Sequence, residues 1–142
     1  MTPHPPSSVC ARPYAGGIFE VNATGGDTRL GGEDFDCNVV NFLTQTFLKQ
    51  HKDVSSLNER ASRRLFAAAE RAKRQLSSAT TAYVEVEALA EGHDLHFTLT
   101  RAKFESLNAA HFDSCLNTVK AVLKDSGISK DQIDDIVLVG GS

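Results

Sequence analysis

Four polar side chains recur along one predicted helix at a spacing that could bind a nucleoside. They are Glu70, Lys73, Arg74 and Ser77, at positions i, i+3, i+4 and i+7 of one helical stripe. A carboxylate, an ammonium and a hydroxyl can hydrogen-bond the hydroxyls of a sugar, while a guanidinium plane can stack on a flat base. A solvated helix face with ordinary ion pairs has the same pattern, and spacing alone favours that interpretation by about three to one.

A glycine pair at the start of another predicted helix could let backbone amides approach an anion. Gly31 and Gly32 precede this helix, and helix N-termini with such backbone freedom are typical phosphate sites. Glu33, Asp34 and Asp36 follow in the first turn, where they suit the helix dipole but repel a bare phosphate unless a metal intervenes. A tight turn without a ligand explains the glycine pair equally well.

Hydrophobic periodicity predicts the helices that position these residues. One helix of about sixteen residues follows Gly32, and a capping box of Ser56 and Glu59 begins the helix that ends near Ser77. Two further helices are predicted over residues 101–107 and 112–126. The last of them is expected to bury one apolar face, made of Phe112, Cys115, Leu116, Val119, Val122 and Leu123.

Strands are predicted from alternation and from continuous apolar runs. Residues 82–88 and 95–99 alternate with period two and predict a hairpin. Residues 18–23 indicate a strand that ends in a glycine turn at 25–27. Residues 136–139 are a continuous apolar run, which predicts a strand buried on both faces and followed by a glycine turn, where α/β folds bind ligands.

The first sixteen residues are predicted to be a disordered leader. All four prolines of the chain lie in this segment, and proline fixes the backbone and removes a hydrogen-bond donor. The leader is therefore expected to form no regular element and to provide no hairpin partner for the strand at 18–23. That unpaired strand, and a buried strand at the other end, predict a chain truncated at both ends.

Composition places the chain among ordinary globular proteins. Of its 142 residues 41% are hydrophobic and 23% are charged, with a net charge of -3. These values exclude a disordered chain and a strongly basic nucleic-acid binder. The helix with the polar stripe carries six basic residues, but Glu59 and Glu70 offset them, so we give nucleic-acid binding about one chance in ten. No apolar run is long enough to cross a bilayer, so we expect no membrane partner and a cytoplasmic location.

No metal site is predicted from the cysteines and histidines. Cys10, Cys37 and Cys115 have spacings that suit neither a zinc site nor a disulfide framework, so they are interpreted as thiols in a reducing environment. His93 and His96 are interpreted as surface residues of the hairpin, because no cysteine or third histidine nearby completes a metal set.

Five segments carry, in order, a resemblance to a known family. They are GIFEV at 17–21, GDTRLGGEDFD at 26–36, AERAKRQLSS at 69–78, LTRAKFE at 99–105 and IVLVGGS at 136–142. Over about residues 17–142 the chain resembles the seventy-kilodalton heat-shock chaperones, in the second lobe of their actin-like nucleotide-binding domain. The resemblance implies an α/β fold class, with a small α+β subdomain and part of a larger actin-like ATPase α/β subdomain. The small one would comprise residues 31–108, and the larger one residues 17–30 with 109–142.

The resemblance also implies a nucleotide site with ATP or ADP as its cofactor. Glu70, Lys73, Arg74 and Ser77 match the residues that hold the adenosine in the family. Gly140, Gly141 and Ser142 match the residues that wrap its other side, and Gly32 matches a residue beside the phosphates.

The catalytic parts of the family have no counterpart in this sequence. Neither phosphate loop, nor the catalytic lysine, nor the aspartates on the magnesium side can be matched, so we expect no catalytic residue and no magnesium ligand. Arg29 also stands where the family more often has histidine, and Phe66 where it usually has arginine.

The sequence therefore predicts a fragment of an ATP-dependent molecular chaperone that carries the adenosine-side half of the nucleotide cleft. ATP hydrolysis coupled to protein folding would be the activity of the parent protein, and adenine nucleotide the ligand. A non-catalytic module that binds nucleotide exchange factors and other co-chaperones is an alternative. A gene fragment without a separate function is another.

Overall fold

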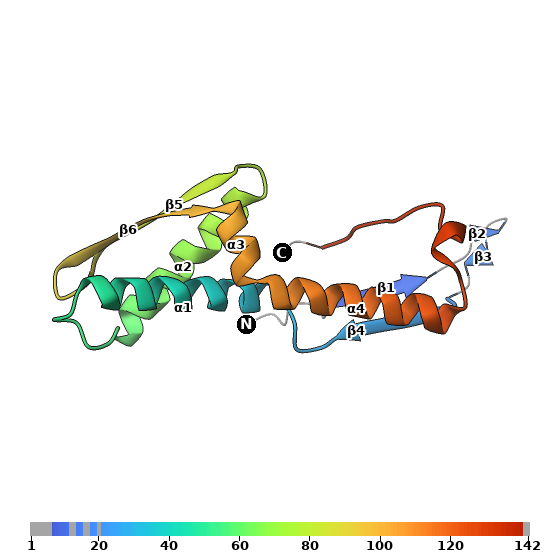
Figure 1. The fold of residues 1–142 in the computed structure, drawn as a ribbon, viewed down its shortest axis with the longest axis horizontal. Helices are drawn as coiled ribbons and strands as arrows, with labels where there is room; N and C mark the ends of the chain where they lie inside the picture. Colours follow the sequence, from blue (N-terminus) through green and yellow to red (C-terminus); the bar gives the residue numbers. More distant parts are fainter. Residues whose placement is uncertain (1–6, 12–13, 16–17, 20, 141–142) are drawn as a thin grey trace. The chain divides into compact units, whose positions relative to one another are not determined.

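The computed structural model describes residues 7–11, 14–15, 18–19 and 21–140 and divides the chain into two compact units. The middle unit is Glu33–Ala109, and the terminal unit combines Met1–Gly32 with Ala110–Ser142. The family subdomains expected at residues 31–108 and at 17–30 with 109–142 stay a prediction. Helices and strands occur in both units, which confirms the mixed α/β fold class (Figure 1).

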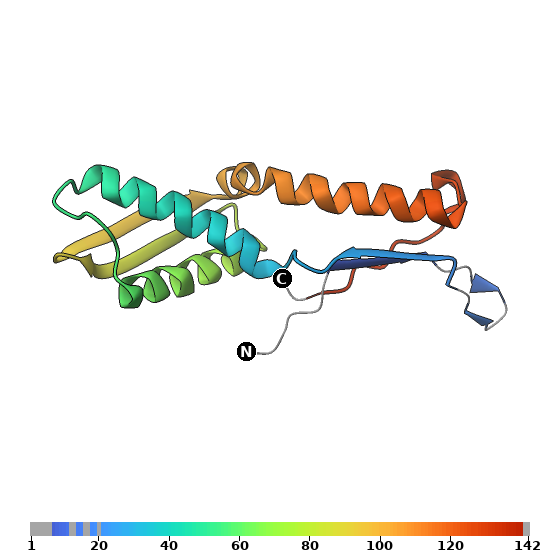
Figure 2. The same cartoon turned by 90° about the horizontal axis from the view of Figure 1, so that it is seen from below.

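Two helices cover one face of a hairpin in the middle unit. Figures 1 and 2 show α1 (Gly32–Gln50) and α2 (Glu59–Leu76) on the same side of β5 (Thr81–Ala90) and β6 (His93–Thr100). The strands are antiparallel, and the pairs Val84 with Phe97 and Val86 with Leu95 point towards the helices. A short helix α3 (Arg101–Leu107) follows, with Thr100 as its N-cap, as the sequence predicts.

The core of the middle unit follows from the spacing of apolar residues. Val39, Leu43 and Phe47, four residues apart on α1, are fully buried. The helix α2 contributes Leu65 and several alanines, whose small side chains let it pack closely on the hairpin. Asn58, rather than the predicted box of Ser56 and Glu59, caps α2 by accepting a hydrogen bond of 2.8 Å from the amide of Ala61.

A β-bulge interrupts β5 between Val86 and Ala90. Ala88 adopts a positive φ of 43° within it. Arg64 on α2 donates to the carbonyl oxygens of Glu87 at 2.6 Å and Ala88 at 3.3 Å. The amide of Ala88 donates to Asp94 on β6 at 2.6 Å. The irregular backbone is therefore held by side chains from both neighbouring elements.

The N-terminal part of the terminal unit forms strands within residues 7–15, where the sequence predicts none. Of the strand predicted at 18–23, residues 18–19 and 23 belong to strands in the described part of the chain. β1 (Ser7–Ala11) pairs antiparallel with β4 (Ala23–Asp27), and β2 (Tyr14–Ala15) pairs with β3 (Ile18–Phe19). The expectation that residues 1–16 form no regular element is wrong for the described strands; residues 1–6, 12–13 and 16 lie outside the described part of the chain. The prediction of a glycine turn at 25–27 is wrong as well, because these residues pair with β1 and therefore continue β4 in an extended conformation.

The helix α4 (Ala109–Ser126) ends at Gly127, which has a φ of +70°. It packs against β4 so closely that a Cβ at Gly25 would lie 2.6 Å from a methyl carbon of Val122. Val122 is the buried residue of this helix, whereas Phe112, Leu116 and Val119 are between 36% and 57% exposed. The helix itself is confirmed, but the prediction of a wholly buried apolar face is wrong.

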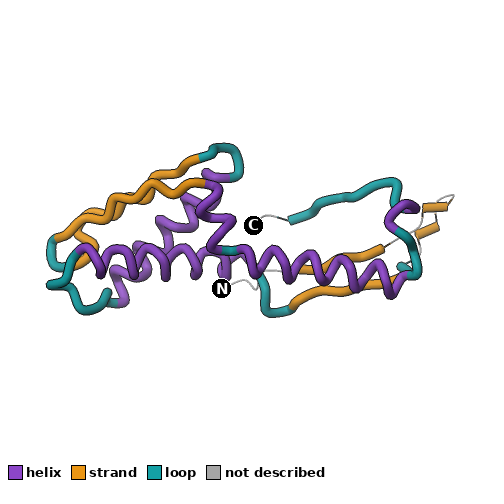
Figure 3. Tube along the Cα trace, in the orientation of Figure 1, coloured by secondary structure: helices purple, strands orange, loops and turns teal. Residues whose placement is uncertain are grey.

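The predicted buried strand at residues 136–139 is not a strand in the structure. After η1 (Lys130–Gln132) the chain runs as a loop, drawn in teal in Figure 3. Ile136, Val137, Leu138 and Val139 are 80% to 93% exposed. A strand is buried on both faces when it belongs to a sheet that is covered above and below, and none of the described strands pairs with this segment. No helix in the described part of the chain is long and apolar enough to span a bilayer.

Candidate functional site

The predicted adenosine residues lie on α2 in the middle unit. Glu70, Lys73 and Arg74 belong to the last two turns of the helix. Ser77 is the C-cap, and its amide donates to the carbonyl oxygens of Arg74 and Gln75. The backbone of one helix therefore brings all four side chains of the stripe into one row, as the sequence predicts.

Lys73 forms a nearly buried ion pair that the sequence did not indicate. Its Nζ lies 2.7 Å from Oδ2 of Asp36 on α1, and the two side chains are 15% and 2% exposed. Burial raises the pKa of Asp36 above its usual value, although the hydrogen bond and the charge of Lys73 act in the opposite direction. The second oxygen, Oδ1, is buried without a hydrogen-bond partner among the described residues. The sequence indicates Asp36 only as a first-turn acid, because it lies thirty-seven positions before Lys73 and no local pattern links the two residues.

Glu70 and Arg74 form an exposed ion pair on the same stripe. Arg74 donates to Oε1 of Glu70 at 2.6 Å. The side chain of Arg74 is 73% exposed and that of Glu70 is 40% exposed. This is the i, i+4 geometry of an ordinary helix pair, worth a few tenths of a kcal/mol. Both residues therefore hold their polar groups at the surface, where a ligand could contact them.

The predicted glycine residues belong to the terminal unit. Gly32 begins α1 and is buried, and Gly140 has a φ of +149°. Gly141 and Ser142 lie outside the described residues. The structure thus groups the four residues of α2 with Asp36, whereas the assignment of the glycines and Ser142 to the same site stays a prediction.

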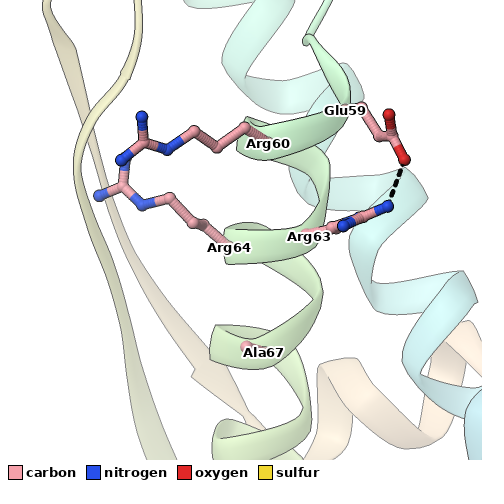
Figure 4. A pocket seen from close by; sticks show the side chains of 5 residues that line it. All are labelled: Glu59, Arg60, Arg63, Arg64 and Ala67. Atoms are coloured by element: carbon pink, nitrogen blue, oxygen red, sulfur yellow. Dashed lines mark hydrogen bonds and ion pairs between the residues drawn. The ribbon is translucent and has the colours of Figure 1, made fainter.

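A shallow pocket lies at the other end of α2, away from the polar stripe. Glu59, Arg60, Arg63, Arg64 and Ala67 line it (Figure 4). Arg60 and Arg64 extend side by side in the figure, and Arg63 turns to pair with Glu59. Since Arg64 also holds the bulge carbonyls, two of these three arginines have partners within the fold. The three arginines therefore form an exposed helix face, on which Arg63 pairs with Glu59 and Arg64 stabilises the bulge.

One cluster of possible metal ligands was missed by sequence reasoning. His93, at the start of β6, lies beside His51 and Asp53 from the loop after α1. A third histidine, His51, therefore lies close to His93 in the fold, which the sequence did not indicate. The ligands come from segments about forty residues apart, so neither spacing nor periodicity could have revealed them. His96 is different, because its side chain is 63% exposed on the outer face of the hairpin.

Comparison with known proteins then decides the family. The model of the family described as Hsp70 protein matches residues 8–142. The chain belongs to the Hsp70 family. The resemblance inferred from the five motifs is thus confirmed, although the match begins at residue 8 and includes part of the segment expected to be unlike the family.

Curated relatives of this Hsp70-family chain are named as molecular chaperones or as heat shock proteins. It is 55% identical over 128 residues to the ribosome-associated molecular chaperone SSB of Candida glabrata, covering 90% of this chain and 21% of the relative. It is 52% identical over 126 residues to heat shock cognate 70 kDa protein 3 of Dictyostelium discoideum, covering 89% and 20%. The chain therefore spans about a fifth of the length of the curated relatives it matches.

Proposed function

We propose that this chain carries the adenosine-side half of the nucleotide cleft of a cytoplasmic, ATP-dependent chaperone. The observation that carries the proposal is the stripe on α2, where Glu70, Lys73 and Arg74 project from one helix within the region matched to the Hsp70 family. ATP hydrolysis coupled to protein folding, including the response to stress, would be the activity of a whole protein of this family.

The chemistry of the stripe suits a nucleoside. The carboxylate of Glu70 can accept hydrogen bonds from ribose hydroxyls, and the exposed guanidinium of Arg74 offers a flat surface to a base. Lys73 is held by the buried Asp36, so its ammonium is fixed before a ligand arrives. Because the ammonium group is already fixed, less side-chain entropy is lost when a ligand binds.

The same residues do not provide for the phosphates and their magnesium ion. Glu70 would repel a phosphate, and the acidic first turn of α1 contains Glu33 and Asp34. When bound by a whole Hsp70 protein, magnesium ATP would supply the phosphoryl group that is transferred to water. This chain would contribute the grip on the adenosine through α2, and the roles of Gly32, Gly140, Gly141 and Ser142 rest on their resemblance to family residues alone.

Calorimetric titration of ADP into the full chain tests this proposal. We expect saturable binding that weakens at least tenfold, about 1.4 kcal/mol, in the variant Glu70→Gln. Glu59→Gln is the matched control, because Glu59 also pairs with an arginine four residues later on α2 but lies outside the stripe. Equal weakening in both variants, or no binding to a folded chain at millimolar ADP, would contradict the proposal.

A second candidate function is docking of nucleotide exchange factors or other co-chaperones on the middle unit. Tyr83 favours it, because this aromatic side chain is 67% exposed on the outer face of β5, and such residues often anchor interfaces. A family exchange factor should bind the full chain in a pull-down, and Tyr83→Ala should weaken it. Capture that is absent, or unaffected by Tyr83→Ala, would exclude this surface.

A further inference from the structure

A histidine, an aspartate and a second histidine meet where the loop after α1 reaches the turn of the hairpin. Nε2 of His93 lies 2.7 Å from Oδ2 of Asp53. The rings of His51 and His93 stack with their centroids 4.1 Å apart and their planes at 26°. One ligand atom from each residue lies within 4.8 Å of the other two. Two imidazoles and one carboxylate therefore converge on one small volume.

Ordered backbone holds each of these side chains. His51 follows directly after α1, its amide donates to the carbonyl of Phe47 at 3.0 Å, and its ring lies 4.6 Å from the buried ring of Phe47. The amide of Val54 donates to the carbonyl of His51 at 3.1 Å, which closes a turn around Asp53, and Val54 is itself buried. His93 is the first residue of β6 and pairs with Ala90 across the turn. The three ligands are therefore presented by a constrained loop and a strand.

The donor set is one that zinc prefers. Zinc binds histidine nitrogen and carboxylate oxygen at about 2.0 to 2.2 Å, and tetrahedral angles then place its ligands about 3.4 Å apart. The distance of 2.7 Å between Nε2 of His93 and Oδ2 of Asp53 is already shorter than this. The other ligand atoms lie within 4.8 Å of one another, so side-chain rotation would have to shorten those distances by little more than an ångström. Magnesium and calcium prefer all-oxygen sets, so the imidazoles select a transition metal.

Charge and exposure leave the site ready for a cation. Asp53 adds a carboxylate oxygen to the ring nitrogens of the two histidines, so the donor set combines one acidic side chain with two imidazoles. The side chains of Asp53 and His93 are 59% and 35% exposed, which leaves an open side for water as the fourth ligand.

We infer that His51, Asp53 and His93 form a binding site for a zinc ion that ties the loop after α1 to the turn of the β5–β6 hairpin. The site lies in the middle unit, and none of its ligands belongs to the polar stripe on α2. It is therefore independent of the proposed nucleotide site.

Titration of zinc chloride into the full chain, followed by calorimetry, tests this inference. We expect one equivalent to bind, with His93→Gln and Asp53→Asn each weakening the affinity at least tenfold. Asp53→Asn is informative because asparagine can still hydrogen-bond to His93 but offers no carboxylate. His96→Gln is the matched control, since it removes an imidazole from the same strand outside the cluster. Equal zinc affinity in His93→Gln and the unchanged chain would overturn the inference.

A spectroscopic probe separates this site from the cysteines. Cys37 and Cys115 are free thiols, as the sequence predicts, and thiolates bind zinc well. Cobalt(II) bound by His51, Asp53 and His93 should show visible ligand-field bands without the thiolate charge-transfer band in the near ultraviolet. Imidazole resonances of His51 and His93 should shift on zinc addition while those of His96 stay in place. A charge-transfer band at the first equivalent, or an undisturbed His93, would overturn the assignment.

Discussion

The middle unit and the terminal unit differ in how much apolar surface they bury. In the middle unit Leu43, Phe47, Leu65 and Leu99 are fully buried between two helices and a hairpin. Among residues 21–32 and 110–140 of the terminal unit, those that bury an apolar side chain are Leu30 and Val122, while residues 136–139 are almost fully exposed. Apolar burial is the dominant favourable term in folding. The middle unit is therefore expected to hold most of the stability of this chain.

The largest expected effect is the loss of a central ring from the middle unit. Phe47→Ala should lower the free energy of unfolding by about 3–5 kcal/mol, because it removes buried surface and leaves a cavity. Leu138→Ala in the terminal unit should change it by less than about 0.5 kcal/mol, since Leu138 is 90% exposed. Urea unfolding followed by circular dichroism measures both. Similar losses in the two variants would break the comparison between the units.

The next largest effect concerns the buried ion pair. Lys73→Met should destabilise the middle unit by about 3 kcal/mol at neutral pH, because an ionised Asp36 is then buried without its partner. The pKa of Asp36 is raised in the folded chain, so protonation of this carboxyl group favours the folded state. The resulting stabilisation is fully present below the usual carboxyl pKa, and it is lost as the pH rises through the raised pKa of the folded chain. The loss caused by Lys73→Met should therefore shrink as the pH falls.

Urea unfolding of the unchanged chain and the variant at several pH values checks this. The double variant Asp36→Asn with Lys73→Met is the control. The difference in its unfolding free energy from that of Asp36→Asn alone should depend much less on pH, because both proteins lack the carboxyl group. A loss in Lys73→Met that stays constant from neutral pH down to about pH 4 would contradict the role of Asp36.

A smaller effect tests the contact within the terminal unit. Gly25→Ala should destabilise the packing of α4 on β4 by about 1–3 kcal/mol, because the new methyl group would collide with Val122. Hydrogen exchange of the α4 amides measures the effect, and Val122→Ala should relieve part of it in the double variant. Unchanged exchange in Gly25→Ala would show that β4 and α4 do not pack as described, and would widen the contrast with the middle unit.

The smallest effect distinguishes the observed cap of α2 from the predicted one. Asn58→Ala should cost about 1 kcal/mol, because the amide of Ala61 loses its acceptor. Ser56→Ala, at the position that sequence reasoning chose as the cap, should cost almost nothing. Thermal unfolding compares the two, and the opposite ranking would restore the predicted capping box.

Local pattern predicted the elements whose burial depends on their own periodicity. The apolar face of α1, including Leu43 and Phe47, and the alternation of β5 and β6 are visible in the sequence and agree with the structure. The polar stripe on α2 is equally local, so the row formed by Glu70, Lys73 and Arg74 was predictable. These features need no knowledge of distant segments.

Features that depend on distant segments could not be predicted. The sequence of Ile136–Val139 predicts burial, but burial requires partner strands, which no local pattern supplies. The strand β1 was missed because prolines around it suggested disorder, although its pairing with β4 orders it. The partners of Lys73 and of His93 were missed for the same reason, since each contact joins residues about forty positions apart.

The bulge in β5 also affects how this hairpin can meet other chains. A two-stranded sheet has two open edges, and an open edge is a template for unwanted pairing with a foreign strand. At the bulge, the carbonyl oxygens of Glu87 and Ala88 already accept hydrogen bonds from Arg64, and the local twist departs from a flat strand. This part of the edge is consequently expected to be a poor template for strand addition, because Arg64 already occupies two of its carbonyl groups.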